Sequence, residues 1–107
     1  MIPLSKPYFT KRENQLFKEV IDSGWVTMGP KVEEFEDSFK DYVGSKYAAA
    51  VSNCTTGMHL SLIALGVKPG DFVITVSHSY IATANSIRHA GAEPLFIDIN
   101  NSNFNID

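Results

Sequence analysis

Basic clusters and long apolar runs are missing from this chain of 107 residues, and its first residues predict no leader segment. Nine Lys and Arg against twelve Asp and Glu give a formal net charge of −3, and the absence of a basic cluster argues against a nucleic-acid partner or an anionic membrane surface. The longest purely apolar runs are about five residues, too short to span a bilayer. The N-terminal sequence MIPLSK lacks the basic-then-apolar pattern of a secretion signal.

Cysteine is scarce and histidine is scattered. Cys54 is the only cysteine, so the chain cannot form an internal disulfide, and we expect a cytoplasmic, reducing compartment. A thiol at a helix start has a lowered pKa, but no paired base is identifiable, and a small buried cysteine is the favoured interpretation. His59, His78 and His89 are too widely spaced to form a zinc-type cluster, so we predict no metal site.

Two helices are predicted in residues 1–44, which we interpret as a helical N-terminal arm. Thr10 and Glu13 fit a capping box, in which each side chain satisfies a backbone N–H at the helix start. The apolar positions that follow share one helical face until Gly24, which predicts the helix end. A second helix is predicted from Pro30 to Gly44. The loop between them carries a Trp and a Met, which suggests a contact surface.

Residues 45–107 change to an alternation of strands and helices. Apolar runs predict buried strands at 47–52, 72–76 and 94–99, with helices from residue 53 to 66 and from 81 to 89. This βαβαβ pattern predicts an α/β fold with a mostly parallel sheet, right-handed crossovers and flanking helices. Too few helices are present to cover both faces of such a sheet, and no helix follows the last strand, so we expect a fragment of a larger domain.

The strongest chemical pattern is SNCTTG, residues 52–57, between a strand and a helix. A helix N-terminus offers unpaired N–H groups and the positive end of a dipole, which together bind phosphate, and small hydroxyl side chains add donors. The same pattern also fits plain N-capping by Ser52 or Thr55. Neither the dinucleotide fingerprint nor the phosphate-loop motif of nucleotide-binding proteins is present, which weakens a nucleotide-binding interpretation.

A second candidate is the loop SHSY, residues 77–80, after the next predicted strand. Ligands of open α/β sheets lie outside the carboxyl ends of the strands, and an aromatic ring there can stack on a flat ligand. The alternative is that Tyr80 begins the next helix and packs locally.

Four longer motifs occur in order along the chain: GWVTMGPKVEEFE at 24–36, AVSNCTTGMHL at 50–60, ALGVKPGD at 64–71 and ATANSI at 82–87. Together they resemble the DegT/DnrJ/EryC1/StrS family of pyridoxal-phosphate enzymes, mainly nucleotide-sugar aminotransferases. The resemblance covers nearly the whole chain. It implies that residues 1–107 are the N-terminal segment of the cofactor-binding large domain of an aspartate-aminotransferase-like, fold-type-I transferase.

The resemblance also implies roles for individual residues. Thr55 and Thr56 match the turn that holds the phosphate of pyridoxal 5′-phosphate, Tyr80 matches the aromatic residue that stacks on its ring, and Asn85 lies near that site. The loop residues Trp25, Thr27 and Gly29 match a segment near the sugar-nucleotide site that often reaches the partner subunit. Enzymes of this family are homodimers that use a keto-sugar nucleotide and an amino donor, usually glutamate.

Two family features are not matched here. The family's Schiff-base lysine lies beyond position 107, and none of the seven lysines matches its motif, so we nominate no catalytic residue and expect the chain by itself to be inactive. Tyr80 is more often Phe or Trp in the family, a tolerable change. Two alternatives stay open at this point. Some members are sugar dehydratases with histidine in place of that lysine, and a stand-alone α/β domain that binds a phosphate ligand also fits.

Overall fold

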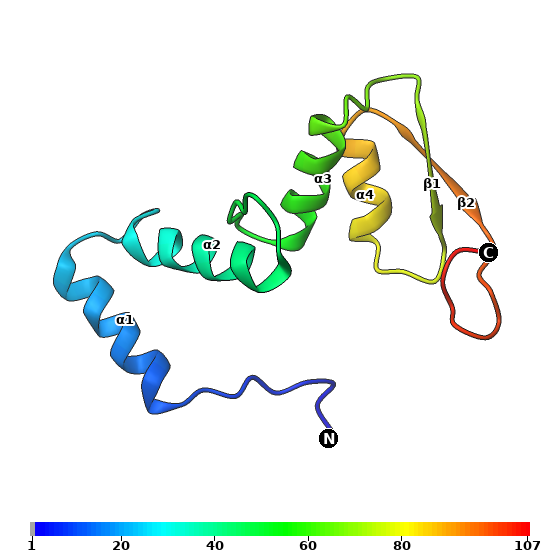
Figure 1. The fold of residues 1–107 in the computed structure, drawn as a ribbon. Coiled ribbons are helices and arrows are strands. Elements are labelled where there is room, and N and C mark those ends of the chain that lie inside the picture. Colours follow the sequence, from blue (N-terminus) through cyan, green and yellow to red (C-terminus); the bar gives the residue numbers. More distant parts are fainter. Residues whose placement is uncertain (1) are drawn as a thin grey trace. The chain divides into compact units, whose positions relative to one another are not determined.

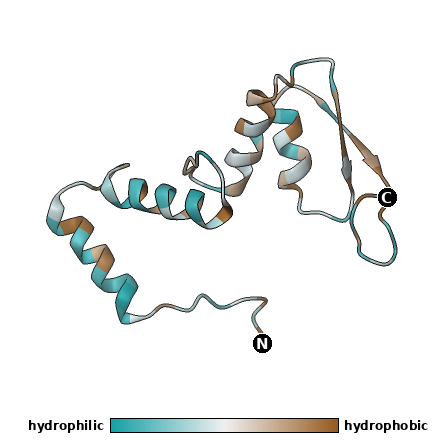
Figure 2. Ribbon diagram, in the orientation of Figure 1, coloured by the Kyte–Doolittle hydropathy of each residue, from teal (hydrophilic) through white to brown (hydrophobic). Residues whose placement is uncertain are grey.

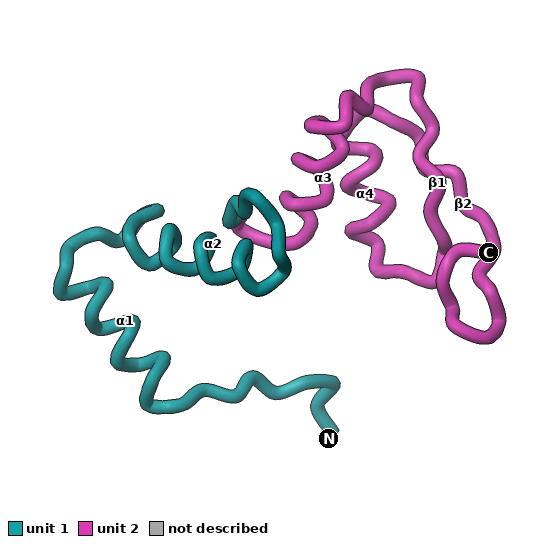
Figure 3. Tube along the Cα trace, viewed as in Figure 1, with its two compact units in different colours: residues 1–50 teal, residues 51–107 magenta. Residues whose placement is uncertain are grey.

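The computed structural model describes residues 2–107 as two compact units, residues 1–50 and 51–107 (Figure 3). The elements labelled in Figure 1 are α1 Lys11–Ser23, α2 Pro30–Val43, α3 Cys54–Ala64, β1 Phe72–Val76, α4 Ala82–His89 and β2 Glu93–Ile97. Of the helices described, none combines the length and apolar character needed to cross a membrane. The sequence predicts a different division, into a helical arm at 1–44 and a strand–helix part of the large domain at 45–107. That division stays a prediction.

The two helices of the first unit begin and end where their sequence signals predict. At the start of α1 the Thr10 hydroxyl accepts from the N–H of Arg12, and the Glu13 carboxylate accepts from the N–H of Thr10, which confirms the capping box. Gly24 has a φ of 71° and ends the helix in the left-handed conformation. α2 begins at Pro30, as predicted, and Gly44 ends it in the same way. Hydrophobic residues recur between hydrophilic ones along α1 (Figure 2), as expected for an amphipathic helix.

The capping box makes the start of α1 sensitive to acid. Hydrogen bonds from Thr10 lower the pKa of Glu13 below its ordinary value of 4.5. Because the folded-state pKa is depressed, the stabilisation is present above the unfolded-state pKa and is lost as pH falls through the folded-state value. We expect the protection of the Thr10 amide, which is its exchange rate relative to that of an unstructured amide at the same pH, to fall as Glu13 becomes protonated in acid, and Glu13→Gln to remove most of this acid response. Hydrogen exchange followed by NMR measures it, and an unchanged acid response in the variant would contradict the assignment.

The segment at 47–52 is not a strand, so that prediction is wrong. A strand exists only where its N–H and C=O groups pair with a neighbouring strand, and the described residues provide no such neighbour for this segment. Instead the N–H of Ala50 donates to the Glu36 carboxylate of α2 at 2.6 Å. The segment is also not buried in the described structure, with Tyr47 75% exposed, so the apolar pattern predicted neither its pairing nor its burial.

The second unit is an α/β arrangement of two parallel strands and two helices, which confirms the predicted fold class with one strand fewer. β1 pairs with β2 in parallel, with Phe72 opposite Glu93 and Val76 opposite Ile97. α3 and α4 lie side by side, and both strands run toward the end at which both helices begin (Figure 1). The carboxyl ends of the strands and the N-termini of the helices therefore meet at one edge of the unit.

The core of the second unit is small and lies where α4 meets the sheet. Ile87, Ala90 and Ala92 are its buried apolar residues, and Thr75 of β1 is buried with them. By contrast, Phe72 is 71% exposed and Ile74 is 54% exposed, because the helices cover only one face of the sheet among the described residues. Figure 2 shows that both strands are largely apolar. The two strands thus have the apolar composition of buried strands, but among the described residues no element packs on one of the two faces of their sheet.

Candidate functional site

The first turn of α3 is held by a side-chain cap. Asn53 Oδ1 accepts from the N–H of Thr56 at 2.9 Å and from the Thr56 hydroxyl at 3.1 Å. Ser52 Oγ lies 3.3 Å from the same hydroxyl. The capping residue is therefore Asn53, and the predicted alternative, capping by Ser52 or Thr55, is wrong. Asn is at least as good a cap as Ser or Thr, because its carbonyl oxygen reaches the same N–H groups.

The cap leaves a set of hydrogen-bond donors at the start of α3. Within residues 2–107 no acceptor is found for the N–H groups of Cys54 and Thr55, nor any partner for the Thr55 hydroxyl. Cys54 is exposed, which contradicts the expected buried cysteine. The result is two backbone donors, one free hydroxyl and a positive dipole end, which is the donor set that a phosphate group requires.

A polar depression of about 440 Å³ opens at this helix start. Asn53, Thr55 and Thr56 form one wall, and His59 and His89 complete the lining. The two imidazole rings have their centroids 5.9 Å apart and are tilted by 48°. No carboxylate is among the residues that line the depression. The site is therefore open to a small anionic ligand.

The helix that follows the second candidate motif, α4, is tied to this first turn. Ser86 of α4 is 1% exposed, and its hydroxyl lies 2.7 Å from the carbonyl oxygen of Ala82 and 3.2 Å from that of Thr55. The small side chain of Ser86 lets α4 approach α3 closely at Thr55. The structure therefore couples the start of α3 to the middle of α4.

Tyr80 and Asn85 lie on the same βα unit as that contact but not in the lining of the depression. Tyr80 is in the loop after β1 and is 80% exposed, so its ring does not pack locally and is available to a ligand. Asn85 is exposed on α4. The loop itself is ordered by local bonds, with Ser79 Oγ 2.6 Å from Thr83 Oγ1. The structure brings Thr55 and Thr56 together and presents Tyr80 and Asn85 separately at its surface.

In the first unit, the predicted substrate-binding residues line a second depression. Trp25, Thr27 and Gly29 lie around a volume of about 320 Å³ between the end of α1 and the start of α2. The indole Nε1 of Trp25 donates to the carbonyl oxygen of Met28 at 2.8 Å. A Cβ at residue 29 would lie 2.3 Å from Trp25 Cδ1, so only glycine leaves room for the folded-back indole. Gly29 has extended backbone, so space rather than backbone conformation requires it.

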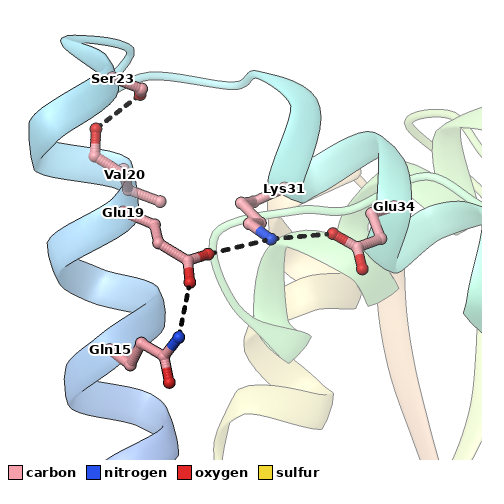
Figure 4. A network of polar contacts seen from close by, with 6 residues as sticks. All are labelled: Gln15, Glu19, Val20, Ser23, Lys31 and Glu34. Atoms are coloured by element: carbon pink, nitrogen blue, oxygen red, sulfur yellow. Dashed lines mark hydrogen bonds and ion pairs between the residues drawn. The ribbon is translucent and has the colours of Figure 1, made fainter.

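An ion-pair network borders this second depression (Figure 4). Lys31 Nζ lies 3.6 Å from Glu19 of α1 and 3.2 Å from Glu34 of α2. Gln15 donates to Glu19 from the previous turn of α1. The hydrogen bond and the charge of Glu34 raise the pKa of Lys31 above its ordinary value. Lys31 therefore stays charged and joins the two helices beside the loop.

Sequence reasoning missed Asn53 as the cap and the pairing of His59 with His89. Asn53 stands three residues before Thr56, which is the spacing of a cap, and that signal was available. His59 follows Thr55 by four residues, which places the two on one face of a helix. The proximity of His89, however, depends on how α3 packs against α4, which no local pattern reveals. Among residues 2–107, no group of three or more potential metal ligands is present.

Comparison with protein families and with curated proteins shows which proteins this chain is similar to. Residues 7–107 match the DegT/DnrJ/EryC1/StrS aminotransferase family. The chain is 46% identical over 106 residues to the spore coat polysaccharide biosynthesis protein SpsC of Bacillus subtilis, covering 99% of this chain and 27% of that protein. A protein of Methanocaldococcus jannaschii, MJ1066, is 42% identical over 106 residues and is covered to 28%. The chain thus spans about a quarter of the length of these relatives.

Solved structures give the same result. Spr1654 of Streptococcus pneumoniae, which carries the name of a sugar aminotransferase, matches with a TM-score of 0.93 at 35% identity, over 99% of this chain and 27% of that one. Its structures include a PLP-form and a PMP-form. An aminotransferase from Brucella abortus, whose name is that of the same family, matches with a TM-score of 0.85 at 32% identity, over 91% of this chain and 26% of that chain.

Proposed function

This chain belongs to the DegT/DnrJ/EryC1/StrS aminotransferase family, and from that membership we propose that it is the N-terminal part of a pyridoxal-phosphate-dependent aminotransferase. The proposed reaction moves an amino group, with glutamate as donor, to a keto-sugar nucleotide in polysaccharide biosynthesis. The observation that carries the proposal is the uncommitted donor set at the start of α3 in a chain of this family. We further propose a cytoplasmic homodimer as the working form.

The residues at the start of α3 fit the cofactor's phosphate. The N–H groups of Cys54 and Thr55, together with the Thr55 hydroxyl, are donors that the Asn53 cap does not use, and Asn53 and Thr56 hold the turn that presents them. The exposed ring of Tyr80 supplies a flat surface for the cofactor ring, and Asn85 adds a polar group on α4. When bound, the cofactor supplies an electron sink for the reacting carbon. These residues bind and orient, and none of them is assigned a proton-transfer role.

On the substrate side, the loop around Trp25, Thr27 and Gly29 is proposed to contact the sugar nucleotide. Its indole edge and the neighbouring backbone form a wall that is partly apolar and partly polar, which suits a nucleotide-linked sugar. In the proposed homodimer this loop reaches the site of the partner subunit. The lysine that holds the cofactor is expected outside residues 1–107, so the chain alone is expected to be inactive.

The test is a reaction of the full-length gene product with pyridoxal 5′-phosphate, glutamate and a panel of keto-sugar nucleotides. We expect an aminated sugar nucleotide and an equal amount of 2-oxoglutarate, both detected by mass spectrometry. Loss of water from the sugar without gain of nitrogen would instead favour the dehydratase alternative, as would a histidine in the lysine position of the full-length sequence. Amino transfer by the purified 107-residue chain would overturn the assignment of the catalytic lysine to a region outside it.

A further inference from the structure

Lys31 stands at an unfavourable place for a cation. It is the second residue of α2, beside the positive end of the helix dipole, where an acidic side chain is normally favoured. Its ammonium group lies between two carboxylates, 3.2 Å from Glu34 of the same helix and 3.6 Å from Glu19 of α1 (Figure 4). These two contacts offset the unfavourable interaction with the dipole.

The pair of Lys31 and Glu19 is the polar link between the two helices of the first unit. In the described part of the chain, no other hydrogen bond or ion pair joins α1 to α2. Glu19 lies four residues before the end of α1, so the pair closes the base of the loop at 24–29. The bond from the Trp25 indole to the Met28 carbonyl oxygen is local and fixes the shape of the loop only. The separation of the two helices therefore depends on the ion pair.

Both members of the pair also line the depression of the proposed substrate loop. Lys31 is the only basic residue in that lining, and Glu19 is the only acidic one. Because the depression lies between the end of α1 and the start of α2, its width follows the separation of the two helices. The side chains are 45% and 44% exposed, and such an exposed pair adds little to the stability of a fold. Its effect is therefore expected on the depression rather than on unfolding.

We propose that Lys31 is a positioning residue for the sugar nucleotide: paired with Glu19, it holds the two helices at the separation at which the loop at 24–29 fits the substrate. This inference rests on the proposed function, because it takes the loop as the substrate contact. A lysine in this lining could instead bind the diphosphate of the substrate directly. The two roles predict opposite effects at Glu19, since a carboxylate beside a phosphate-binding lysine weakens phosphate binding, whereas a carboxylate that completes the interhelical pair supports substrate binding.

The experiment measures KM and kcat of the full-length enzyme with the keto-sugar nucleotide of the panel that it aminates fastest. The variants are Glu19→Gln, Lys31→Met and the two combined. We expect KM to rise about two- to fivefold in each single variant, the effect of one exposed ion pair, with kcat nearly unchanged. The double variant should be no worse than the single ones, because the same pair is lost in all three. Cofactor affinity should not change, since no proposed cofactor-binding residue lies on α1 or α2.

Glu34→Gln is the matched control. Glu34 pairs with the same ammonium group but lies on the same helix as Lys31, so its loss should leave KM nearly unchanged. Lys31→Arg keeps the cation and should keep KM near the wild-type value. Loss of the cation should not destabilise α2, because the helix dipole disfavours a cation at that position. Thermal unfolding of all variants should therefore stay close to that of the wild type.

Amide hydrogen exchange, followed by mass spectrometry without substrate, adds a readout that does not need activity. The N–H groups of Val32 and Glu33 donate to the Gly29 carbonyl oxygen, so peptides over residues 24–33 report the order of the loop and the start of α2. They should exchange faster in Glu19→Gln and Lys31→Met than in the wild type and Glu34→Gln. Equal exchange in all four proteins would overturn the proposal.

The kinetic outcomes separate this proposal from the proposed function. A lower KM in Glu19→Gln together with a higher KM in Lys31→Met would show direct phosphate contact and overturn the positioning role. Equal effects of Glu19→Gln and Glu34→Gln on KM, or no effect of either substitution of the interhelical pair, would also overturn it while leaving the proposed function in place. Amination of no member of the panel by the wild type would overturn the proposed function and, with it, this role.

Discussion

Replacement of Thr55 by Val in the full-length protein is expected to weaken the binding of pyridoxal 5′-phosphate by roughly 10- to 100-fold, the value of a hydrogen bond to a charged group. Val has nearly the shape of Thr, and the Thr55 hydroxyl has no partner among residues 2–107. The variant therefore removes a hydrogen-bond donor that the protein offers to the cofactor phosphate, and it removes no hydrogen bond that stabilises the fold. Cofactor titration measures the loss, and thermal unfolding of the apoenzyme should be nearly unchanged.

Thr56→Val is the matched control, because its hydroxyl is already engaged. That hydroxyl donates to Asn53 Oδ1 at 3.1 Å and lies 3.3 Å from Ser52 Oγ. Its loss should lower the stability of the first turn, by about 1 kcal/mol or less, with a smaller direct effect on the cofactor. The double variant should lose at least as much cofactor affinity as Thr55→Val. Unchanged affinity in the double variant would count against the phosphate assignment.

Replacement of Gly29 by Val is expected to raise the KM for the sugar nucleotide by about tenfold or more, the range for losing an ordered binding wall. The new Cβ would overlap the Trp25 ring at 2.3 Å, so the indole must leave its place and its 2.8 Å bond to the Met28 carbonyl. Cofactor affinity should be unchanged, because the start of α3 contains none of these residues. Steady-state kinetics with separate cofactor titration resolve the two effects.

A double-mutant cycle tests whether Gly29 acts through Trp25. Trp25→Ala removes the ring with which the new side chain would collide. If the collision is the cause, Trp25→Ala/Gly29→Val should be little worse than Trp25→Ala alone. Additive losses would show instead that residue 29 affects the substrate by another route, and the assigned role of the indole would be wrong.

Local signals predicted the helices well because local bonds make them. The capping box of Thr10 and Glu13 and the left-handed residues Gly24 and Gly44 operate within one turn, so their positions are readable from a few neighbouring residues. The β1 strand was also predicted correctly, because its β-branched run finds a pairing partner, β2, within the chain, although that pairing is not local. The segment at 47–52 has equally apolar character, yet it forms no strand because pairing is not a local property.

In the candidate site, too, some features could be predicted from local sequence and others could not. The donors at the start of α3 follow from the start of a helix, which is visible in the residue types at 52–57. The identity of the cap, the approach of Ser86 to Thr55 and the meeting of His59 with His89 depend on helix packing. The overlap between Trp25 and a side chain at Gly29 depends on a loop that folds back on itself. Residue types therefore indicated the chemistry, while packing decided which atoms are available for it.

The difference between local and distant bonds also bears on synthesis. The capping box at Thr10 and the glycine ends of α1 and α2 join residues a few positions apart, so these helices can form as soon as they leave the ribosome. The β1–β2 pairing instead waits for Glu93–Ile97, and until then the backbone N–H and C=O groups of β1 lack this partner on the nascent chain. The interval between the synthesis of β1 and that of its partner is thus a stage at which an unpaired strand edge is open to association with other chains.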